Sequence, residues 1–273
     1  MHRLLMLLGL SAASIAMAVA QPSYSSTKAG SFLDRIGIQS LLWDDPYDGF
    51  DYDVASQVFP DYPQFSIFQF DDFTVDGCAW RIRKITAYGN ELGNAANNQA
   101  VRVRIQERAD FENPGTIYLD AGGIETGENV ASLLEFNNLS LILPAGQYFM
   151  TVYVVRDYNS GLQWFWWRNT PVQKSQHVFH NPGNGFGFGS SPQDGSQIFG
   201  WEADMSFTIE GDHAFIIGDV TGDCCVDDDD LSLVLENFGS QCTDCPADIN
   251  GDGVVDDTDL ALVLERFGDG CDD

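Results

Sequence analysis

The sequence has few basic residues. Thirteen Lys and Arg stand against 41 Asp and Glu, a formal net charge of -28 over 273 residues. Because nucleic acids are polyanions, this balance argues against a nucleic-acid partner and leaves cations and neutral surfaces. Long apolar runs are also scarce: after the first twenty residues, no stretch approaches the roughly 20 apolar residues of a membrane-spanning helix. We therefore expect no transmembrane segment.

The first twenty residues, MHRLLMLLGLSAASIAMAVA, have the pattern of a signal peptide. His2 and Arg3 precede an apolar run too short to span a bilayer, and Ala18-Val19-Ala20 forms an A-x-A cleavage site. We predict a signal peptide over 1–20 and a secreted mature protein, extracellular or at the cell surface.

Cysteine is nearly absent from the body of the chain. Cys78 stands alone, and the other five cysteines are Cys224, Cys225, Cys242, Cys245 and Cys271. In an exported chain this clustering favours disulfides over a redox motif, and "CTDC" at 242–245 is interpreted as bridge partners, with a zinc half-site as the alternative. An odd number in the C-terminal part means that one is free or pairs with Cys78 or another chain.

Charge also divides the chain. Residues 219–273 contain seventeen Asp or Glu and one basic residue, Arg266, a local net charge of -16. We predict a β-sandwich domain over 21–212 and a separate acidic tail over 213–273. The tail contains a repeat, 219–239 and 248–268, offset by 29 residues.

Each copy begins with a twelve-residue acidic loop, the first loop at 219–230 and the second loop at 248–259. Oxygen ligands at loop positions 1, 3, 5, 9 and 12, a backbone carbonyl at position 7 and a glycine at position 6 are the spacing of a Ca²⁺ loop. In the second loop these ligands are Asp248, Asn250, Asp252, Val254, Asp256 and Asp259, with Gly253 at the turn. In the first loop they are Asp219, Thr221, Asp223, Cys225, Asp227 and Asp230.

Calcium is the cofactor that this spacing predicts, and the alternative is a solvated acidic run. Cys224 occupies the turn position of the first loop, where a side chain costs on the order of 1 kcal/mol. We therefore expect the first loop to be the poorer site unless a disulfide from Cys224 or Cys225 holds the turn. After each loop, apolar residues at i, i+3, i+4 and i+7 predict a short amphipathic helix, LSLVLENFG and LALVLERFG, with Gly239 and Gly268 as C-caps. We expect the two stripes to pack on each other.

This doubled loop and helix resembles a dockerin module, in the cysteine-bearing form of bacterial dockerin-anchored exported proteins. The resemblance implies a calcium-dependent interaction with a cohesin-like or other surface receptor protein. It also implies that the receptor is contacted at loop positions 10 and 11, which are Asp228, Asp229, Asp257 and Thr258. These pairs differ from the Ser-Thr type of the best-known dockerins.

The body has strand patterns separated by turn-rich segments. In "VRVRIQE", Val101, Val103 and Ile105 share one face, and 65–75, 80–89, 147–155, 162–168 and 206–210 have similar patterns. Many short strands predict a mainly β fold, an antiparallel sandwich. The phrases "DDFTVDGCAWRIRKITAYG" and "LPAGQYFMTVYV" resemble jelly-roll-like extracellular domains.

The body lacks catalytic motifs: G-x-S-x-G, a P-loop and H-E-x-x-H are all absent. We predict no catalytic residue. His177 and His180 in "HVFH" are interpreted as surface histidines, with metal binding as the alternative. Carboxylates for glycoside hydrolysis are available but not singled out by the sequence: Asp71, Asp72, Glu125, Glu128 and Glu135.

The run "WFWW" suggests carbohydrate binding as a possible function. In a strand, Trp164 and Trp166 share one face, and exposed indole rings stack on sugars. The expected function is a non-catalytic exported sandwich tethered by its tail to an extracellular or cell-surface assembly. The alternatives are a polysaccharide-binding module that uses Trp164 and Trp166, or a polysaccharide-acting hydrolase.

Overall fold

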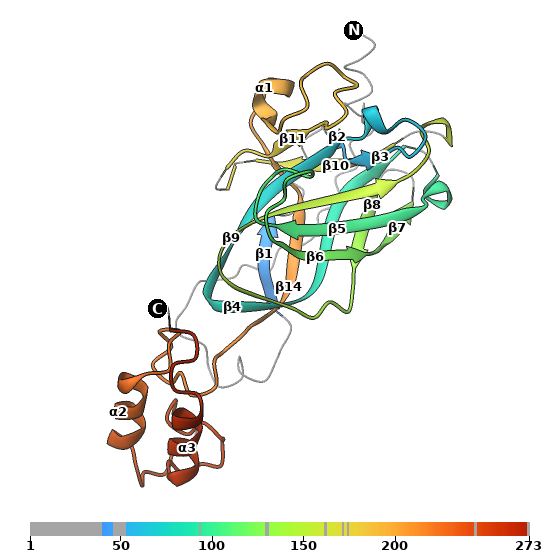
Figure 1. Ribbon diagram of the computed structural model, residues 1–273. Coiled ribbons are helices and arrows are strands. Elements are labelled where there is room, and N and C mark those ends of the chain that lie inside the picture. The colour runs from blue at the N-terminus through green and yellow to red at the C-terminus, as the bar shows by residue number, and fades with distance from the viewer. Residues whose placement is uncertain are drawn as a thin grey trace.

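The computed structural model describes residues 40–45, 53–92, 94–128, 131–160, 163–170, 172–173, 175–242 and 245–271 (Figure 1). The predicted signal peptide, 1–20, lies outside these ranges. Within them, no helix combines the length and the apolar character needed to cross a membrane.

The body is mainly β, and its central strands lie in the order β1-β14-β4-β9-β5-β6. Every strand pair is antiparallel except β3 with β9. The strands are β1 Ser40–Asp45, β2 Asp53–Ala55, β3 Gln57–Val58, β4 Phe68–Glu91, β5 Ala100–Gln106, β6 Ile117–Gly122, β7 Ile124–Glu128, β8 Ala131–Phe136, β9 Leu141–Val155, β10 Trp164–Asn169, β11 Val178–His180, β12 Gln193–Asp194, β13 Asp204–Met205 and β14 Phe207–His213.

Strand β4 organises the body. Its 24 residues join the two strands predicted at 65–75 and 80–89, and a register shift against β9 between Val75 and Ala79 marks where they meet. Gly77 lies in this shift with φ +64°, a conformation that favours glycine. Because β4 is so long, it pairs with β8, β9, β10, β11 and β14.

The predicted alternation of apolar and polar residues produces the core. Val101, Val103 and Ile105 on β5 are buried together, as expected from their period of two. They belong to one cluster with residues of β4, β8, β9, β10 and β14, including Trp80, Phe73 and Phe207. The mainly β, antiparallel prediction is confirmed.

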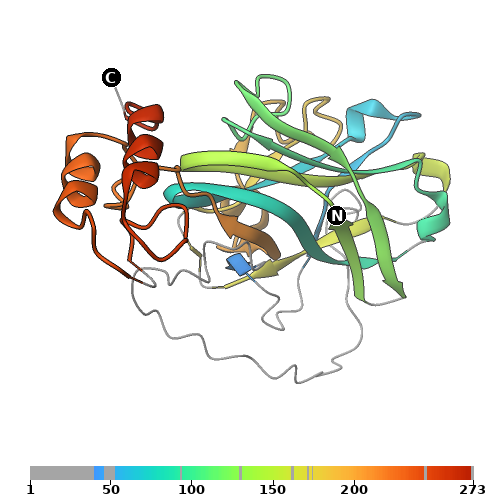
Figure 2. The same ribbon diagram turned by 90° about the horizontal axis from the view of Figure 1, so that it is seen from below.

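Three short 3-10 helices, Pro63–Phe65, Ala95–Asn97 and Tyr158–Ser160, and one five-residue helix, α1 Gly195–Phe199, are the helical elements described in the body. Two longer helices follow the acidic loops: α2 Asp228–Glu236 and α3 Asp257–Glu265. Figure 2 shows α2 and α3 next to each other at one end of the molecule, beside the sheet.

All six cysteines are paired. Cys242 bonds Cys245, as the interpretation of "CTDC" expects, and Cys225 bonds Cys271. Cys78 on β4 bonds Cys224 in the first loop, so the odd cysteine of the tail is joined to the body.

Candidate functional site

The second loop is closed by its first and last carboxylates. Asp248 Oδ1 accepts a hydrogen bond from the backbone N–H of Gly251 (2.9 Å), and its Oδ2 accepts one from Gly253 (2.9 Å). Asp259 Oδ1 accepts from Ile249 (2.7 Å), ten residues earlier. Both aspartates therefore hold backbone N–H groups of the same loop.

The first loop has the same bonds at equivalent positions. Asp219 Oδ1 accepts from Gly222 (2.7 Å), and its Oδ2 accepts from Cys224 (3.0 Å). Asp230 Oδ1 accepts from Val220 (2.8 Å). The sequence repeat is thus also a structural repeat at the level of single hydrogen bonds.

Each loop is also braced by the segment that follows the other helix. The Val226 N–H donates to Asp269 (3.0 Å), and the Val226 carbonyl accepts from Gly268 (2.8 Å). Val255, 29 residues later, donates to Ser240 (3.1 Å) and accepts from Gly239 (2.8 Å). The two repeats therefore exchange equivalent contacts, and neither loop is held by its own repeat alone.

The first loop brings carboxylates together. Asp219, Asp223 and Asp230 each offer an oxygen within 4.8 Å of the others, a group that could hold a metal ion. Burial raises the pKa of Asp219 above its ordinary value, against the N–H donations of Gly222 and Cys224. Three hard oxygen donors suit Ca²⁺ or Mg²⁺ rather than a soft metal.

The second loop, all of which the structure describes, has no equivalent group of three carboxylates. Here position 3 is Asn250, whose amide donates to Asp252 (3.1 Å). Position 9, Asp256, caps α3 by accepting from Thr258 (2.8 Å). The remaining predicted ligands of the two loops, Thr221, Cys225, Asp227 and Val254, lie on the same loops.

Cys224 has the left-handed backbone expected at the turn position, with φ +77°. Both Cys224 and its neighbour Cys225 are held by disulfides, to Cys78 and Cys271. This is the condition under which we expected the first loop to keep its turn.

Both helices begin earlier and end earlier than the sequence predicts. Each starts at loop position 10, because Asp227 and Asp256 act as N-caps and form capping boxes with Asp230 and Asp259. The C-caps are Asn237 and Arg266 rather than the glycines. Gly239 and Gly268 lie two residues further on, with φ +79° and +89°.

Only half of each apolar stripe packs inward, which corrects the expectation that the whole stripes meet. Val234 and Val263 are fully buried in a small core that both helices share with the loop residues Val226 and Val255. The outer residues remain exposed: Leu235 by 52%, Phe238 by 46%, Leu264 by 56% and Phe267 by 48%.

These exposed apolar residues lie on the same helices as the predicted receptor-contact positions. Asp228, Asp229, Asp257 and Thr258 are all exposed on the first turns of α2 and α3. Asp228 and Leu235 are seven residues apart, as are Asp257 and Leu264, so each pair lies on one helix face. Two equivalent surfaces, each acidic at one end and apolar at the other, result.

Trp164 and Trp166 do not form an exposed platform. Both indoles are fully buried, and their Nε1 groups donate to Ser132 Oγ (3.2 Å) and to the Ser206 carbonyl (2.8 Å). The inward face of β10 carries them into the main core, so carbohydrate binding through these two residues is wrong.

The surface interpretation of the two histidines is also wrong. His177 is fully buried and stacks on Phe199 and Trp201, with Nδ1 2.9 Å from the Ala203 carbonyl. His180 is buried with Nδ1 accepting from the Phe111 N–H (3.1 Å). Backbone groups pair with Nδ1 of both rings and with Nε2 of His180, which lies 3.0 Å from the Ser190 carbonyl, whereas His177 Nε2 is buried without a hydrogen-bond partner among the described residues. The aromatic neighbours of His177 are distant in sequence.

Of the available carboxylates, Glu125 accepts from Ser132 (2.5 Å), and Glu135 forms an ion pair with Lys84 (3.3 Å). The side chain of Glu128 lies outside the described residues. Asp71 and Asp72 are buried on β4. Asp71 meets Asp45 and Asp204, two residues that the sequence did not single out because they lie far away along the chain.

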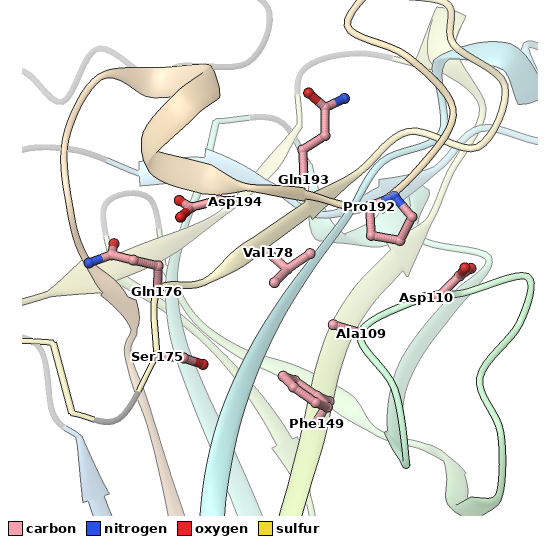
Figure 3. Close-up of a pocket in the computed structure, with 9 residues that line it drawn as sticks. All are labelled: Ala109, Asp110, Phe149, Ser175, Gln176, Val178, Pro192, Gln193 and Asp194. Carbon is pink, nitrogen blue, oxygen red and sulfur yellow. The ribbon is translucent and has the colours of Figure 1, made fainter.

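An open pocket of about 460 Å³ lies between the segment before β11 and the loop after β5 (Figure 3). Ser175, Gln176, Val178 and Asp194 border it from one side, and Ala109 and Asp110 from the other. Asp110 and Asp194 accept backbone N–H bonds within their own turns. Both pocket carboxylates are therefore held by their own turns, and Asp110 also lies 3.8 Å from His180 Nδ1.

No protein-family model and no curated protein matches this chain. Among solved structures, that of infectious bursal disease virus, Gx strain, is similar at 13% sequence identity with a TM-score of 0.24. The match covers 72% of this chain and 43% of that chain, so this chain spans less than half of its length. A likeness this weak carries no argument about function.

Proposed function

We propose that this protein is an exported, non-catalytic β-sandwich held to an extracellular or cell-surface assembly by a calcium-dependent, dockerin-like tail. The observation that carries the proposal is the doubled loop and helix, whose two copies share carboxylate bonds, capping boxes and reciprocal bracing. An acidic loop whose first and last carboxylates accept N–H groups of the same loop supports cation binding over a solvated acidic run, and in the first loop Asp219, Asp223 and Asp230 also come together.

Calcium would act by neutralising repulsion. The tail has a net charge of -16, and its core is two nine-residue helices with five buried valines between helices and loops. Helices this short are marginal in water alone, so ion binding would supply folding free energy. Three disulfides are compatible with an oxidising location outside the cytoplasm.

The receptor would contact the two equivalent helix faces. Leu235 with Phe238 and Leu264 with Phe267 are exposed pairs, and apolar groups that recur on a surface mark protein interactions. A receptor protein of the cohesin type, with a surface that is apolar and basic, would complement the exposed leucines and aspartates.

The test uses the full mature chain, because the tail is bonded to the body. Surface proteins from the source organism would be passed over immobilised chain in Ca²⁺ or EGTA, and the retained receptor would then be purified and its affinity measured. We expect specific, Ca²⁺-dependent binding that Leu235→Asp with Leu264→Asp abolishes. Leu41→Asp, an equally exposed leucine of β1, is the matched control. Equal binding in EGTA would reject the tether.

A further inference from the structure

Three aspartates meet inside the β body, remote in sequence from the tail loops. Asp45 ends β1, Asp71 lies on β4 and Asp204 begins β13, and their side chains are only 1%, 2% and 3% exposed. Each offers a carboxylate oxygen, and these oxygens all lie within 4.8 Å of one another. Three negative charges brought this close without water are strongly unfavourable unless something neutralises them.

Backbone and amide donors satisfy part of this cluster. Asp71 Oδ2 accepts from the Met205 N–H (2.5 Å), Asp204 Oδ2 accepts from the Gln173 N–H, and Asp45 Oδ1 accepts from the Asn169 amide. These neutral donors fix the carboxylates in place. None of these three donors carries a positive charge.

Asp204 provides a second, separate observation. Its Oδ1 is buried and has no hydrogen-bond partner within the described chain. Neither Asp71 nor Asp204 forms an ion pair with a described Lys, Arg or His. A buried carboxylate oxygen without a donor is destabilising, and an ion at the cluster would offset that cost.

The dimensions fit a hard divalent cation. Two oxygens bound to one Ca²⁺ at 2.3–2.6 Å lie no more than about 5.2 Å apart, and Ca²⁺ accepts carboxylates in irregular geometry.

We infer that Asp45, Asp71 and Asp204 form a binding site for a divalent cation of the Ca²⁺ class that joins β1, β4 and β13. This site is distinct from the two acidic loops of the tail. Its ion would be structural, since the three carboxylates are buried.

The experiment separates body and tail ions. A full-length variant with Asp219→Ala and Asp248→Ala would be equilibrated with Ca²⁺, and bound metal per chain would be counted by mass spectrometry after desalting. We expect one ion to remain. Adding Asp204→Asn should remove it, while Asp212→Asn, a buried body aspartate paired with Arg81 and Arg83, should leave it in place.

Thermal unfolding guards against a variant that merely fails to fold. In EGTA, Asp204→Asn should be at least as stable as the parent, because it removes a buried charge. In Ca²⁺ only the parent should gain in Tm. The body site would be overturned if the variant with Asp219→Ala and Asp248→Ala held no ion, or if adding Asp204→Asn left its ion count unchanged. More than one ion in the variant with Asp219→Ala and Asp248→Ala would instead count against the ligands assigned in the tail.

Discussion

At the scale of single residues, His177 shows how a polar side chain is used inside this body. It is fully buried between Phe199 and Trp201, and its Nδ1 hydrogen-bonds the Ala203 carbonyl. A Cβ on Gly195 would lie 2.1 Å from its Nε2, so the ring fills a space that only glycine leaves open. Burial lowers the pKa of His177 to about 4, so the ring is neutral at pH 7.

This burial predicts a pH dependence of stability. The folded pKa of about 4 lies below the ordinary histidine value of 6.5, so between these values the unfolded chain binds a proton that the folded chain does not. The free energy of unfolding should therefore fall as pH drops from 6.5 towards 4, by at most about 3 kcal/mol from this residue. Urea unfolding of the parent and of His177→Gln across this range should differ in slope.

His213→Gln is the matched control, because His213 is exposed. If the parent and His177→Gln lose stability in parallel between pH 6.5 and 4, the buried histidine does not titrate as proposed. A lower overall stability of His177→Gln would not matter, since only the slope against pH is compared.

The residues that sequence reasoning misplaced share one cause. Trp164, Trp166 and His177 were judged from local alternation, which shows which residues share a face but not which face is covered. The partners that bury them are remote: Ser132 lies 32 residues before Trp164, Ser206 lies 40 residues after Trp166, and Ala203 lies 26 residues after His177. Local patterns cannot contain that information.

At the scale of elements, the acidic loops were predictable because their geometry is local. The spacing of Asp248 and Asp259 brings both carboxylates onto the N–H groups of the same loop. The sequence could not show which apolar residues of each helix would stay exposed. A nine-residue helix that packs against one other helix fully buries only the residues that face it, here Val234 and Val263. The alternation of apolar and polar residues predicted the strands at 65–75 and 80–89, but it did not predict that they form the single long strand β4.

The second loop gives a direct test of ion binding. Asp248→Ala removes the carboxylate that accepts from Gly251, Asp252 and Gly253, so both a ligand and the loop closure are lost. Calorimetric Ca²⁺ titration should lose the tighter binding event, with affinity reduced at least tenfold. Asp257→Ala makes the same charge change at an exposed position on the first turn of α3 and should leave the binding events of both tail loops in place. An unchanged titration of Asp248→Ala would refute the ligand assignment.

The turn of the first loop predicts a difference between two double variants. With Cys78→Ser freeing the disulfide, Cys224→Gly should retain the turn, whereas Cys224→Ala has to adopt the same φ of +77° without the bond. The alanine variant should bind Ca²⁺ at the first loop several-fold more weakly, since the strain is on the order of 1 kcal/mol. Equal first-loop affinities would show that the turn conformation does not limit this site.

At the scale of the whole molecule, negative charge is concentrated at one end and covalently joined to the body. The disulfide Cys78–Cys224 ties the first loop to β4, and Cys225–Cys271 ties the same loop to the end of the described chain. Gly270, with φ +77°, packs so closely that a Cβ would lie 2.3 Å from the Cys224 carbonyl oxygen. Removal of ions should therefore loosen the tail without releasing it.

Arg266 makes that loosening measurable, because it is the one basic residue in 219–273. It is the C-cap of α3, and its backbone N–H donates to Val263 (3.2 Å), so trypsin should cut there only after the last turn opens. With disulfides intact, EGTA should raise the cleavage rate at Arg266 at least tenfold over Ca²⁺, read by mass spectrometry after reduction. The rate at Arg108, which is exposed in the body, corrects for the effect of Ca²⁺ on the protease itself. Equal corrected rates would mean that disulfides and the valine core hold the tail folded without an ion. The net charge of -16 would then not serve to bind an ion that folding requires.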